Sequence, residues 1–349
     1  MTGVQWINVA PGEGDQRLDR WLRRRFPHVP QGRIEKMCRK GEIRIDGRRA
    51  RPGVRVEDGQ SVRVPPLPEA RRQASRAEGP VCQADAEMIR RTVIYRDAHV
   101  IALNKPSGLA VQGGTKQRRH VDGLADALRF ECKDRPRLVH RLDKDTSGIL
   151  LLARTRAVAN ALAKAFRTRG VRKIYWAAVA GVPNPRTGVI RYGLAKARGQ
   201  GRAGEGEKVH VVPPEDVGRR PDARHATTDY SVLAALGTRT SWVALVPVTG
   251  RTHQLRAHMA GIGHPVVGDG KYGGSGQENL GDGWGAQLGG DISRKLHLHA
   301  RSLLLDHPVT GDRLELVAPL PLHMKQTWKL LEWDASGVPE DPFQGAGFP

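Results

Sequence analysis

The chain has 349 residues, and its 57 lysines and arginines against 36 aspartates and glutamates give a formal net charge of +21. This surplus favours a polyanionic partner, because each phosphate contact releases counterions from a nucleic acid. No apolar run reaches the ~18 residues of a spanning helix, and the first residues lack the basic-then-apolar pattern of a secretion signal. Cys38, Cys82 and Cys132 are spaced too widely for a disulfide framework or a zinc site. We therefore expect a cytoplasmic protein that binds nucleic acid and no membrane.

The first elements predict a small domain over residues 15–66. Two sets of apolar residues follow helical spacing and indicate two short amphipathic helices. These residues are Leu18, Trp21, Leu22 and Phe26, followed by Ile34, Met37 and Cys38. From residue 43 to residue 64 the apolar period changes to two, and Asp46-Gly47 supplies a hairpin turn. Two helices followed by a small antiparallel sheet resemble the alpha-L RNA-binding motif.

Basic side chains gather in this domain. Residues 17–63 contain 15 basic and 6 acidic residues. A solvated charged face is the plain alternative, but the resemblance to an RNA-binding motif favours contacts with phosphates, which position a protein without specifying a sequence. The candidates around the second helix are Arg33, Lys36, Arg39, Lys40 and Arg44.

Residues 67–90 have no sustained apolar period and are predicted to be a linker. One large domain is expected over residues 91–325, followed by a C-terminal extension over residues 326–349. Strands are predicted at residues 93–104, 149–153, 172–180, 241–248 and 314–319, and a helix at residues 157–167. Strands interspersed with fewer helices indicate an α+β fold. The glycine-rich stretches at residues 197–224 and 273–290 are predicted to be surface loops.

The most informative segment is residues 140–148, which read HRLDKDTSG and run directly into the apolar residues 149–153. An apolar run of this length beside a turn predicts a fully buried central strand. A carboxylate in the loop that enters such a strand lies at the rim of the core, where active sites are usually built. The alternative is that Asp143 or Asp145 only caps a turn.

The segment resembles the catalytic motif of the RluA-type pseudouridine synthases, in which the aspartate after His-Arg-Leu is essential. That residue is Asp143 in this chain. Residues 104–109, 173–177 and 249–269 resemble three further motifs of the family in the same order. The resemblance implies a mixed, mostly antiparallel sheet bent around a central cleft. Among the family's branches, the alpha-L module and the motif look closest to the RluC-like enzymes, which act on large-subunit ribosomal RNA.

The chemistry of this family requires few groups. Isomerising uridine breaks the bond from C1′ to N1, turns the base and rejoins it through C5, so neither a redox cofactor nor a metal is expected. An ionised aspartate can attack C1′ or remove a ribose proton, and the sequence leaves both routes open. The resemblance implies that Asp143 plays this part, that Tyr175 stacks on the target base and that Arg251 pairs with the aspartate. Arg256 is the second candidate for this pairing.

Further residues of the large domain are expected to meet RNA. A base inside a duplex cannot expose C1′, so the target uridine must leave the stack. Arg141 is expected to fill the space that it leaves, and Lys105 and Arg256 are further candidates for RNA contact. His140 is expected to be structural or to face the RNA.

Two alternatives belong to other classes of protein. A metallohydrolase could use His253 and His258, or His297 and His299 with Asp306, but neither pair has the spacing of a helical zinc site. A non-catalytic RNA-binding assembly factor would be expected to have lost the aspartate or the tyrosine of the motifs. This chain retains both, as Asp143 and Tyr175. The resemblance therefore implies an RNA pseudouridine synthase, which we expect to act as a monomer on large-subunit ribosomal RNA.

Overall fold

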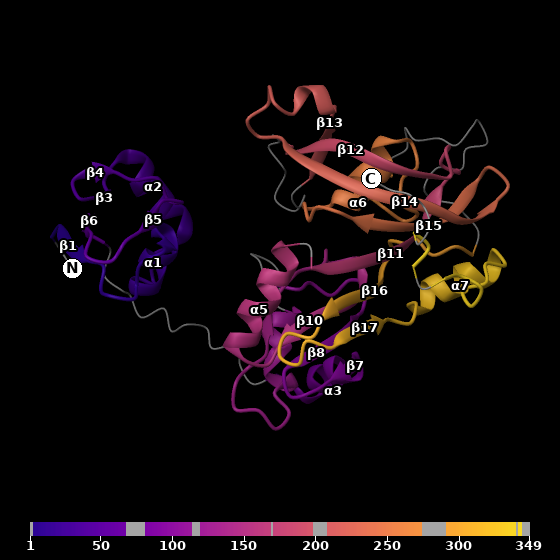
Figure 1. Ribbon diagram of the computed structural model, residues 1–349, viewed down its shortest axis with the longest axis horizontal. Coiled ribbons are helices and arrows are strands. Elements are labelled where there is room, and N and C mark those ends of the chain that lie inside the picture. Colours follow the sequence, from indigo (N-terminus) through magenta and orange to yellow (C-terminus); the bar gives the residue numbers. More distant parts are fainter. Residues whose placement is uncertain are drawn as a thin grey trace. The chain divides into compact units, whose positions relative to one another are not determined.

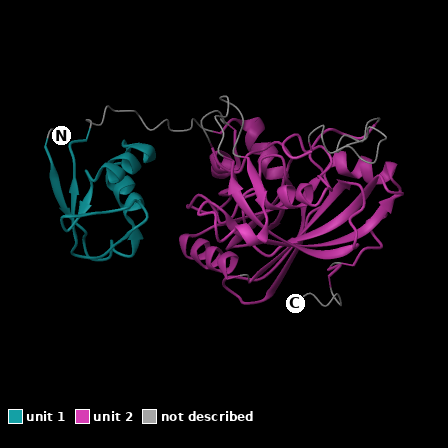
Figure 2. Cartoon of the chain, turned by 90° about the horizontal axis from the view of Figure 1, so that it is seen from above, with its two compact units in different colours: residues 1–79 teal, residues 80–349 magenta. Residues whose placement is uncertain are grey.

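The computed structural model describes residues 3–67, 81–113, 119–168, 170–197, 208–273, 291–339 and 341–343. The chain folds into two compact units, which are Met1–Gly79 (unit 1) and Pro80–Pro349 (unit 2) (Figure 2). In the ranges described, no helix combines the length and the apolar character needed to cross a membrane.

Unit 1 contains the two predicted helices and a small sheet. Helices α1 (Leu18–Arg25) and α2 (Gln31–Lys40) bury the apolar residues that predicted them. The strands are β1 (Gln5–Asn8), β2 (Gln16–Arg17), β3 (Arg44–Ile45), β4 (Arg48–Arg49), β5 (Arg55–Val56) and β6 (Ser61–Val64). The sheet order is β1-β6-β3-β4, and β2 pairs with β5. Asp46 and Gly47 form the predicted turn with φ angles of 47° and 78°, the left-handed conformation of a two-residue hairpin.

Unit 2 is built on an 11-stranded sheet (Figure 1). Its path is β13-β12-β14-β15-β11-β16-β10-β8-β7, with β17 paired to β16 and β9 paired to β10. The strands are β7 (Val93–Arg96), β8 (Val100–Lys105), β9 (Arg137–Leu138), β10 (Ser147–Ala153), β11 (Val171–Ala180), β12 (Thr187–Lys196), β13 (Val209–Val212), β14 (Arg224–Leu236), β15 (Thr240–Pro247), β16 (Leu298–Asp306) and β17 (Arg313–Val317). Among these described strands only β10 and β16 pair in parallel, so the mixed, mostly antiparallel α+β fold is confirmed.

Helices cover both faces of this sheet. They are α3 (Gln83–Arg91), α4 (Val121–Leu124), α5 (Arg156–Arg167), α6 (Gln254–Gly261) and α7 (Leu322–Leu330). Every residue of β10 is buried, because alternate side chains point into two cores. Leu150 and Leu152 pack in the cluster that contains Ile89 of α3, whereas Leu151 packs with Val158 of α5. The apolar run after the HRLDKDTSG segment is therefore the central strand that its composition predicts.

Three predicted boundaries differ from the structure. Unit 1 begins before residue 15, since β1 pairs with β6. The predicted linker 67–90 is shorter, because Leu67 is buried in unit 1 and α3 packs Ile89 into unit 2; residues 68–80 lie outside the described ranges. The strand predicted at residues 93–104 is two strands, because the carboxylate of Asp97 accepts hydrogen bonds from the main chain at the turn between them.

Described residues of the predicted extension 326–349 belong instead to the core of unit 2. Trp328 and Trp333 are buried against Trp242 of the sheet, with ring centroids 5.4 Å and 6.2 Å away. Large aromatic side chains contribute strongly to a core, so the chain as far as Phe343 stabilises the sheet. Residues 344–349 are not among the described residues.

The predicted loop 197–224 also contains a strand. β13 pairs with β12 at the end of the sheet, and Val209 and Val212 are buried. This four-residue strand is too short for its alternation of apolar and polar side chains to distinguish it from a loop in the sequence. The rest of that prediction at residues 198–207, and most of the second loop at residues 274–290, fall outside the described residues.

Candidate active site

Asp143 stands in the loop that enters β10, and the start of that strand is fixed to β16. Gly148 has a φ of 106°, and a Cβ on it would lie 2.2 Å from the carbonyl oxygen of Ala300. Only glycine allows this close approach of two backbones. The Oγ of Ser147 lies 2.9 Å from Nδ1 of His299. The end of the HRLDKDTSG segment thus anchors the aspartate loop to the neighbouring strand.

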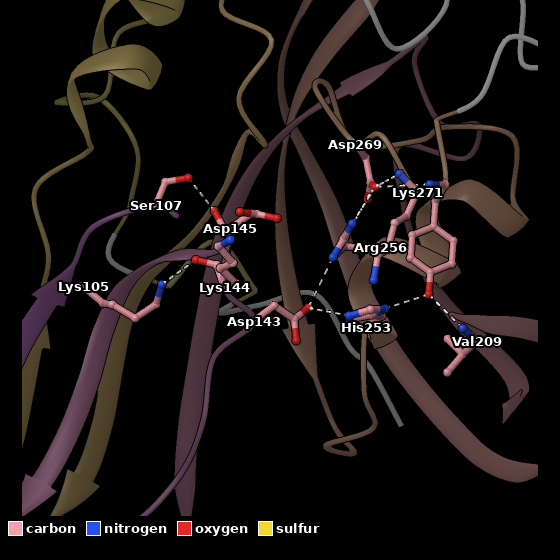
Figure 3. Close-up of polar contacts among 11 residues, drawn as sticks. Lys105, Ser107, Asp143, Lys144, Asp145, Val209, His253, Arg256, Asp269 and Lys271 are labelled. Carbon is pink, nitrogen blue, oxygen red and sulfur yellow. Dashed lines mark hydrogen bonds and ion pairs between the residues drawn. The ribbon is translucent and has the colours of Figure 1, made fainter. Parts of the chain in front are cut away.

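Lys105 holds the other side of this loop. Its side chain is completely buried, and Nζ donates to the carbonyl oxygens of Pro106 and Leu109 at 3.0 and 2.8 Å. It also donates to the carbonyl oxygen of Lys144 at 2.9 Å (Figure 3). Burial lowers the pKa of Lys105 to about 7, against the attraction of Asp145 and Asp143. The predicted contact of Lys105 with RNA is wrong, because all three directions of its ammonium group are used inside the protein.

The motif at residues 104–109 therefore supports the loop that carries Asp143. Besides the lysine, the Oγ of Ser107 donates to the carbonyl oxygen of Asp145 at 2.8 Å (Figure 3). The amide of Gly108 donates to the carbonyl oxygen of Lys144 at 3.0 Å. Gly108 has a φ of 86°, which is a conformation that favours glycine. Backbone hydrogen bonds on two consecutive residues fix the main chain directly after Asp143.

A pocket of about 310 Å³ opens beside this aspartate. Five of the predicted site residues line it, namely Arg141, Asp143, Tyr175, Arg251 and Arg256. Lys173 also lines it, so the two polar side chains of the motif at residues 173–177 share one face of β11, as their spacing predicts. Burial, with a contribution from the charge of Asp143, raises the pKa of Tyr175. Its phenol therefore stays protonated.

The expected ion pair between Asp143 and Arg251 is wrong in this structure. Arg251 is exposed, and its Nε donates to the carbonyl oxygen of His225 at 3.2 Å. Its backbone amide donates to Oε1 of Gln254, which fixes the turn before α6. The second candidate, Arg256, lies on α6 and places a guanidinium nitrogen 3.7 Å from Oδ2 of Asp143.

Arg256 is itself held by a buried carboxylate. Its Nε and a terminal nitrogen donate to the two oxygens of Asp269 at 2.7 and 2.6 Å, and the Asp269 side chain has no exposed surface. Burial opposes the charge of Arg256, but the hydrogen bonds and charge of Asp269 outweigh it and raise its pKa. Arg256 is only 5% exposed and its guanidinium group lies beside Asp143, so its contact with RNA stays a prediction.

Two residues of the site were not predicted. Nε2 of His253 lies 3.9 Å from Oδ2 of Asp143, and Nδ1 lies 2.9 Å from the hydroxyl oxygen of Tyr272. His253 is the N-cap residue of α6 and has a φ of 53°, an uncommon conformation for a residue other than glycine. The spacing in the sequence could have indicated His253 as a site residue. It lies three positions before Arg256, and residues three apart are neighbours on a helix.

The remaining predicted residues divide clearly. Arg141 is exposed at the pocket. His140 is structural: its Nε2 accepts from the amide of Leu151 at 2.8 Å and its ring stacks on Phe166 at 4.5 Å, while burial lowers its pKa to about 3. The five basic candidates of unit 1 are exposed on α2 and β3, and their contact with RNA stays a prediction. They are Arg33, Lys36, Arg39, Lys40 and Arg44.

The histidines considered for a metal site do not converge. His297, which precedes β16, bonds to Thr327 and the carbonyl oxygen of Lys295, whereas Asp306 at the end of that strand pairs with Arg313. Within the described part of the chain, no three histidine, cysteine or acidic side chains are grouped closely enough to hold a metal ion.

Comparison with known proteins agrees with this geometry. A family described as RNA pseudouridylate synthase matches residues 99–261, and the S4 domain matches residues 16–62. The chain is 35% identical over 328 residues to the ribosomal large subunit pseudouridine synthase C of Salmonella typhi, which covers 94% of this chain and 97% of the relative. The chain belongs to the RNA pseudouridylate synthase family.

Other members of the family are similar over comparable lengths. The enzyme of the same name from Vibrio cholerae serotype O1 is 33% identical over 93% of this chain and 96% of its own length. Among solved structures, human RNA pseudouridylate synthase domain containing 4 is 30% identical, with a TM-score of 0.55 over 71% of this chain and 95% of that chain. The S4 match lies within the region predicted to be the alpha-L RNA-binding domain.

We predict that Lys105→Met weakens folding and catalysis more than RNA binding. Three carbonyl oxygens lose their donor, so the free energy of unfolding should fall by about 2–4 kcal/mol. Isomerisation should slow at least about tenfold, because small misplacements of a reacting group are costly. Chemical denaturation, single-turnover rates and RNA titration measure the three effects. Lys144→Met is the control: its side chain is exposed, and unfolding should change by less than about 0.5 kcal/mol. Weaker RNA binding with unchanged stability would restore Lys105 as an RNA contact.

Proposed function

We propose that this chain is an RNA pseudouridine synthase that isomerises specific uridines of large-subunit ribosomal RNA. The observation that carries the proposal is the placement of Asp143 in one pocket with Tyr175, Arg256 and His253. The names of the relatives from Salmonella typhi and Vibrio cholerae support the choice of RNA.

The pocket residues account for the steps of the reaction. Asp143 acts at the ribose, either by attacking C1′ or by removing a ribose proton, and the bond from C1′ to N1 breaks. The uracil leaves with the bonding electrons, turns within the pocket and bonds to C1′ through C5. In this step the bond from Asp143 to C1′ breaks on the first route, and the ribose regains its proton from Asp143 on the second. C5 then loses a proton, and N1 gains one. The ring of Tyr175 forms a wall on which the base can stack, and Arg256 holds a positive charge beside the carboxylate.

The target uridine must leave its helix to reach Asp143. Arg141 is exposed at the pocket, and we propose that it enters the stack in place of the uridine. The exposed cations on α2 and β3 of unit 1 are proposed to track the phosphate backbone. The reaction is a redox-neutral rearrangement, so we expect turnover without added metal or cofactor. We further propose that the enzyme works as a monomer in the cytoplasm, where its three free cysteines stay reduced.

The test is to incubate the purified chain with transcribed large-subunit ribosomal RNA and to map pseudouridines at nucleotide resolution. We expect one or a few new positions, which should also be absent from ribosomal RNA of cells that lack the gene. Activity on transfer RNA alone would overturn the substrate assignment, and no pseudouridine in any RNA would overturn the activity.

We predict that removing unit 1 (Met1–Gly79) weakens RNA binding without changing the chemical step. Unit 2 has its own core, so it should fold alone. The dissociation constant for a structured ribosomal RNA fragment should rise roughly tenfold or more, through lost phosphate contacts and effective concentration. The single-turnover rate at saturating RNA should stay within about threefold, since all pocket residues lie in unit 2. A folded unit 2 that is inactive at saturating RNA would show that unit 1 belongs to the active site.

A further inference from the structure

A chain of polar contacts leads from the edge strand β13 to Asp143 (Figure 3). The backbone amide of Val209 donates to the hydroxyl oxygen of Tyr272 at 3.1 Å. The same oxygen lies 2.9 Å from Nδ1 of His253, and Nε2 of that ring faces Asp143. Val209 lies in a segment that sequence analysis predicted to be a loop, so this contact has no counterpart in the predicted site.

The protons in this chain can be assigned from donor and acceptor chemistry. A backbone N–H only donates, so the hydroxyl of Tyr272 accepts from Val209 and keeps its own hydrogen for another partner. If Nδ1 of His253 carried the proton of a neutral ring, the bare Nε2 would face the lone pairs of the Asp143 carboxylate, which is repulsive. The favoured arrangement is therefore a Tyr272 hydroxyl that donates to Nδ1, and an Nε2–H that points at Asp143.

The imidazole is neutral in this arrangement. Burial lowers the pKa of His253 below its ordinary value, and the positive charges of Arg256 and Lys271 act in the same direction. The charges of Asp143 and Asp269 oppose this effect without reversing it. At neutral pH the site thus holds one fixed N–H donor that carries no net charge.

This donor approaches Asp143 without bonding to it. Nε2 of His253 and a guanidinium nitrogen of Arg256 lie 3.9 and 3.7 Å from the same oxygen, Oδ2, and both distances exceed those of a hydrogen bond. Two donors that converge beside a carboxylate at this range can turn to a substrate oxygen that enters between them. Negative charge spreads to the carbonyl oxygens of the uracil when it leaves C1′, and a fixed donor at such an atom stabilises the transition state.

We propose that His253 is a further catalytic residue whose neutral imidazole donates an Nε2–H hydrogen bond to a carbonyl oxygen of the detached uracil. Tyr272 is a positioning residue, because its hydroxyl holds the ring in the tautomer that carries this proton. The inference rests on the proposed function, since it needs a uracil in the pocket. A neutral histidine suits this task better than an imidazolium, because it does not form a tight ion pair with Asp143.

The test compares two amide substitutions that keep different parts of the imidazole. His253→Gln places an N–H donor near the position of Nε2, whereas His253→Asn keeps a polar atom only near Nδ1. The single-turnover rate at saturating RNA should fall about 100-fold in His253→Asn, the usual effect of losing one such donor, and within about tenfold in His253→Gln. The single-turnover rate of Tyr272→Phe should lie between the rates of these two variants. The RNA dissociation constant should stay within about threefold in all three variants, since phosphate contacts carry most of the affinity.

His264→Gln is the matched control. This histidine follows α6 in the same motif, bonds to the carbonyl oxygen of Ala180 and does not line the pocket, so its rate should equal that of the unmodified chain. Thermal unfolding of each variant shows that the site is folded. An unmodified chain that is inactive on every RNA would overturn the proposed function. An active chain whose His253→Asn variant keeps its rate would overturn this inference alone. Equal large losses in the Asn and Gln variants would also overturn it, because they would show that the imidazole itself moves a proton.

Discussion

Asp143→Asn should abolish pseudouridine formation, with a fall of about 10⁴-fold or more, as expected when the reacting group itself is removed. The amide keeps the size of the side chain but can neither attack C1′ nor accept a ribose proton as a carboxylate does. The loop stays in place, because Lys105, Ser107 and Gly108 hold it through backbone carbonyl oxygens. RNA affinity should remain within about threefold, since it depends mainly on lysine and arginine contacts.

Asp145→Asn is the matched control for this variant. The Asp145 side chain is exposed, and its structural contact is the carbonyl oxygen that accepts from Ser107, which the substitution leaves unchanged. Quantification of pseudouridine by mass spectrometry in single-turnover reactions should show appreciable activity for Asp145→Asn. An active Asp143→Asn protein, with deamidation excluded, would mean that the wrong carboxylate was chosen.

The sequence predicted the position of Asp143 because local signals decide it. A turn-forming segment followed by five apolar residues specifies a loop and a central strand without reference to the rest of the chain. Tyr175 was predicted from the resemblance of residues 173–177 to a family motif, and strand alternation placed it on the same face as Lys173. The helices of unit 1 and the Asp46-Gly47 hairpin are local features of the same kind.

The partner of Asp143 could not be predicted in this way. Arg251 and Arg256 belong to one motif, and nothing in their order shows which of them reaches the carboxylate. The structure decides it by starting α6 at Gln254, so that Arg256 lies on the helix and Arg251 precedes it. Asp269 then fixes the guanidinium from a different segment, and such a contact between distant segments has no periodic signal.

Burial that depends on distant segments was the other source of error in the predictions. Lys105 reads as a surface cation, but three carbonyl oxygens gather around its ammonium group only after residues 105–109 meet the aspartate loop. The C-terminal residues were likewise assigned outside the domain, although Trp328 and Trp333 complete an aromatic cluster with Trp242. In both cases one deciding neighbour is distant in the sequence, namely Lys144 for the lysine and Trp242 for the two tryptophans.

Buried histidines should make unit 2 unfold in mild acid before unit 1 does. Burial lowers the pKa of His140 and His299 to about 3 and that of His258 and His297 to about 4. In the unfolded chain these groups return to about 6.5. Between pH 6.5 and 4 the unfolded chain therefore binds more protons, so the stability of unit 2 is full above pH 6.5 and is lost as the pH falls through this window. At pH 4, protonation of each of these histidines in the unfolded chain lowers the free energy of unfolding by up to about 3 kcal/mol.

Unit 1 provides an internal comparison, because its one histidine, His28, is only half-buried. Calorimetry from pH 7 to pH 4 should show one transition that moves strongly to lower temperature and one that moves little. His258→Leu isolates one proton, since neither ring nitrogen of His258 has a hydrogen-bond partner among the described residues, and the substitution therefore removes no such bond there. The slope of unfolding free energy against pH should decrease by about one proton in this variant. An unchanged slope, or a unit 2 that is as stable at pH 4 as at pH 7, would show that these histidines are already protonated in the folded protein.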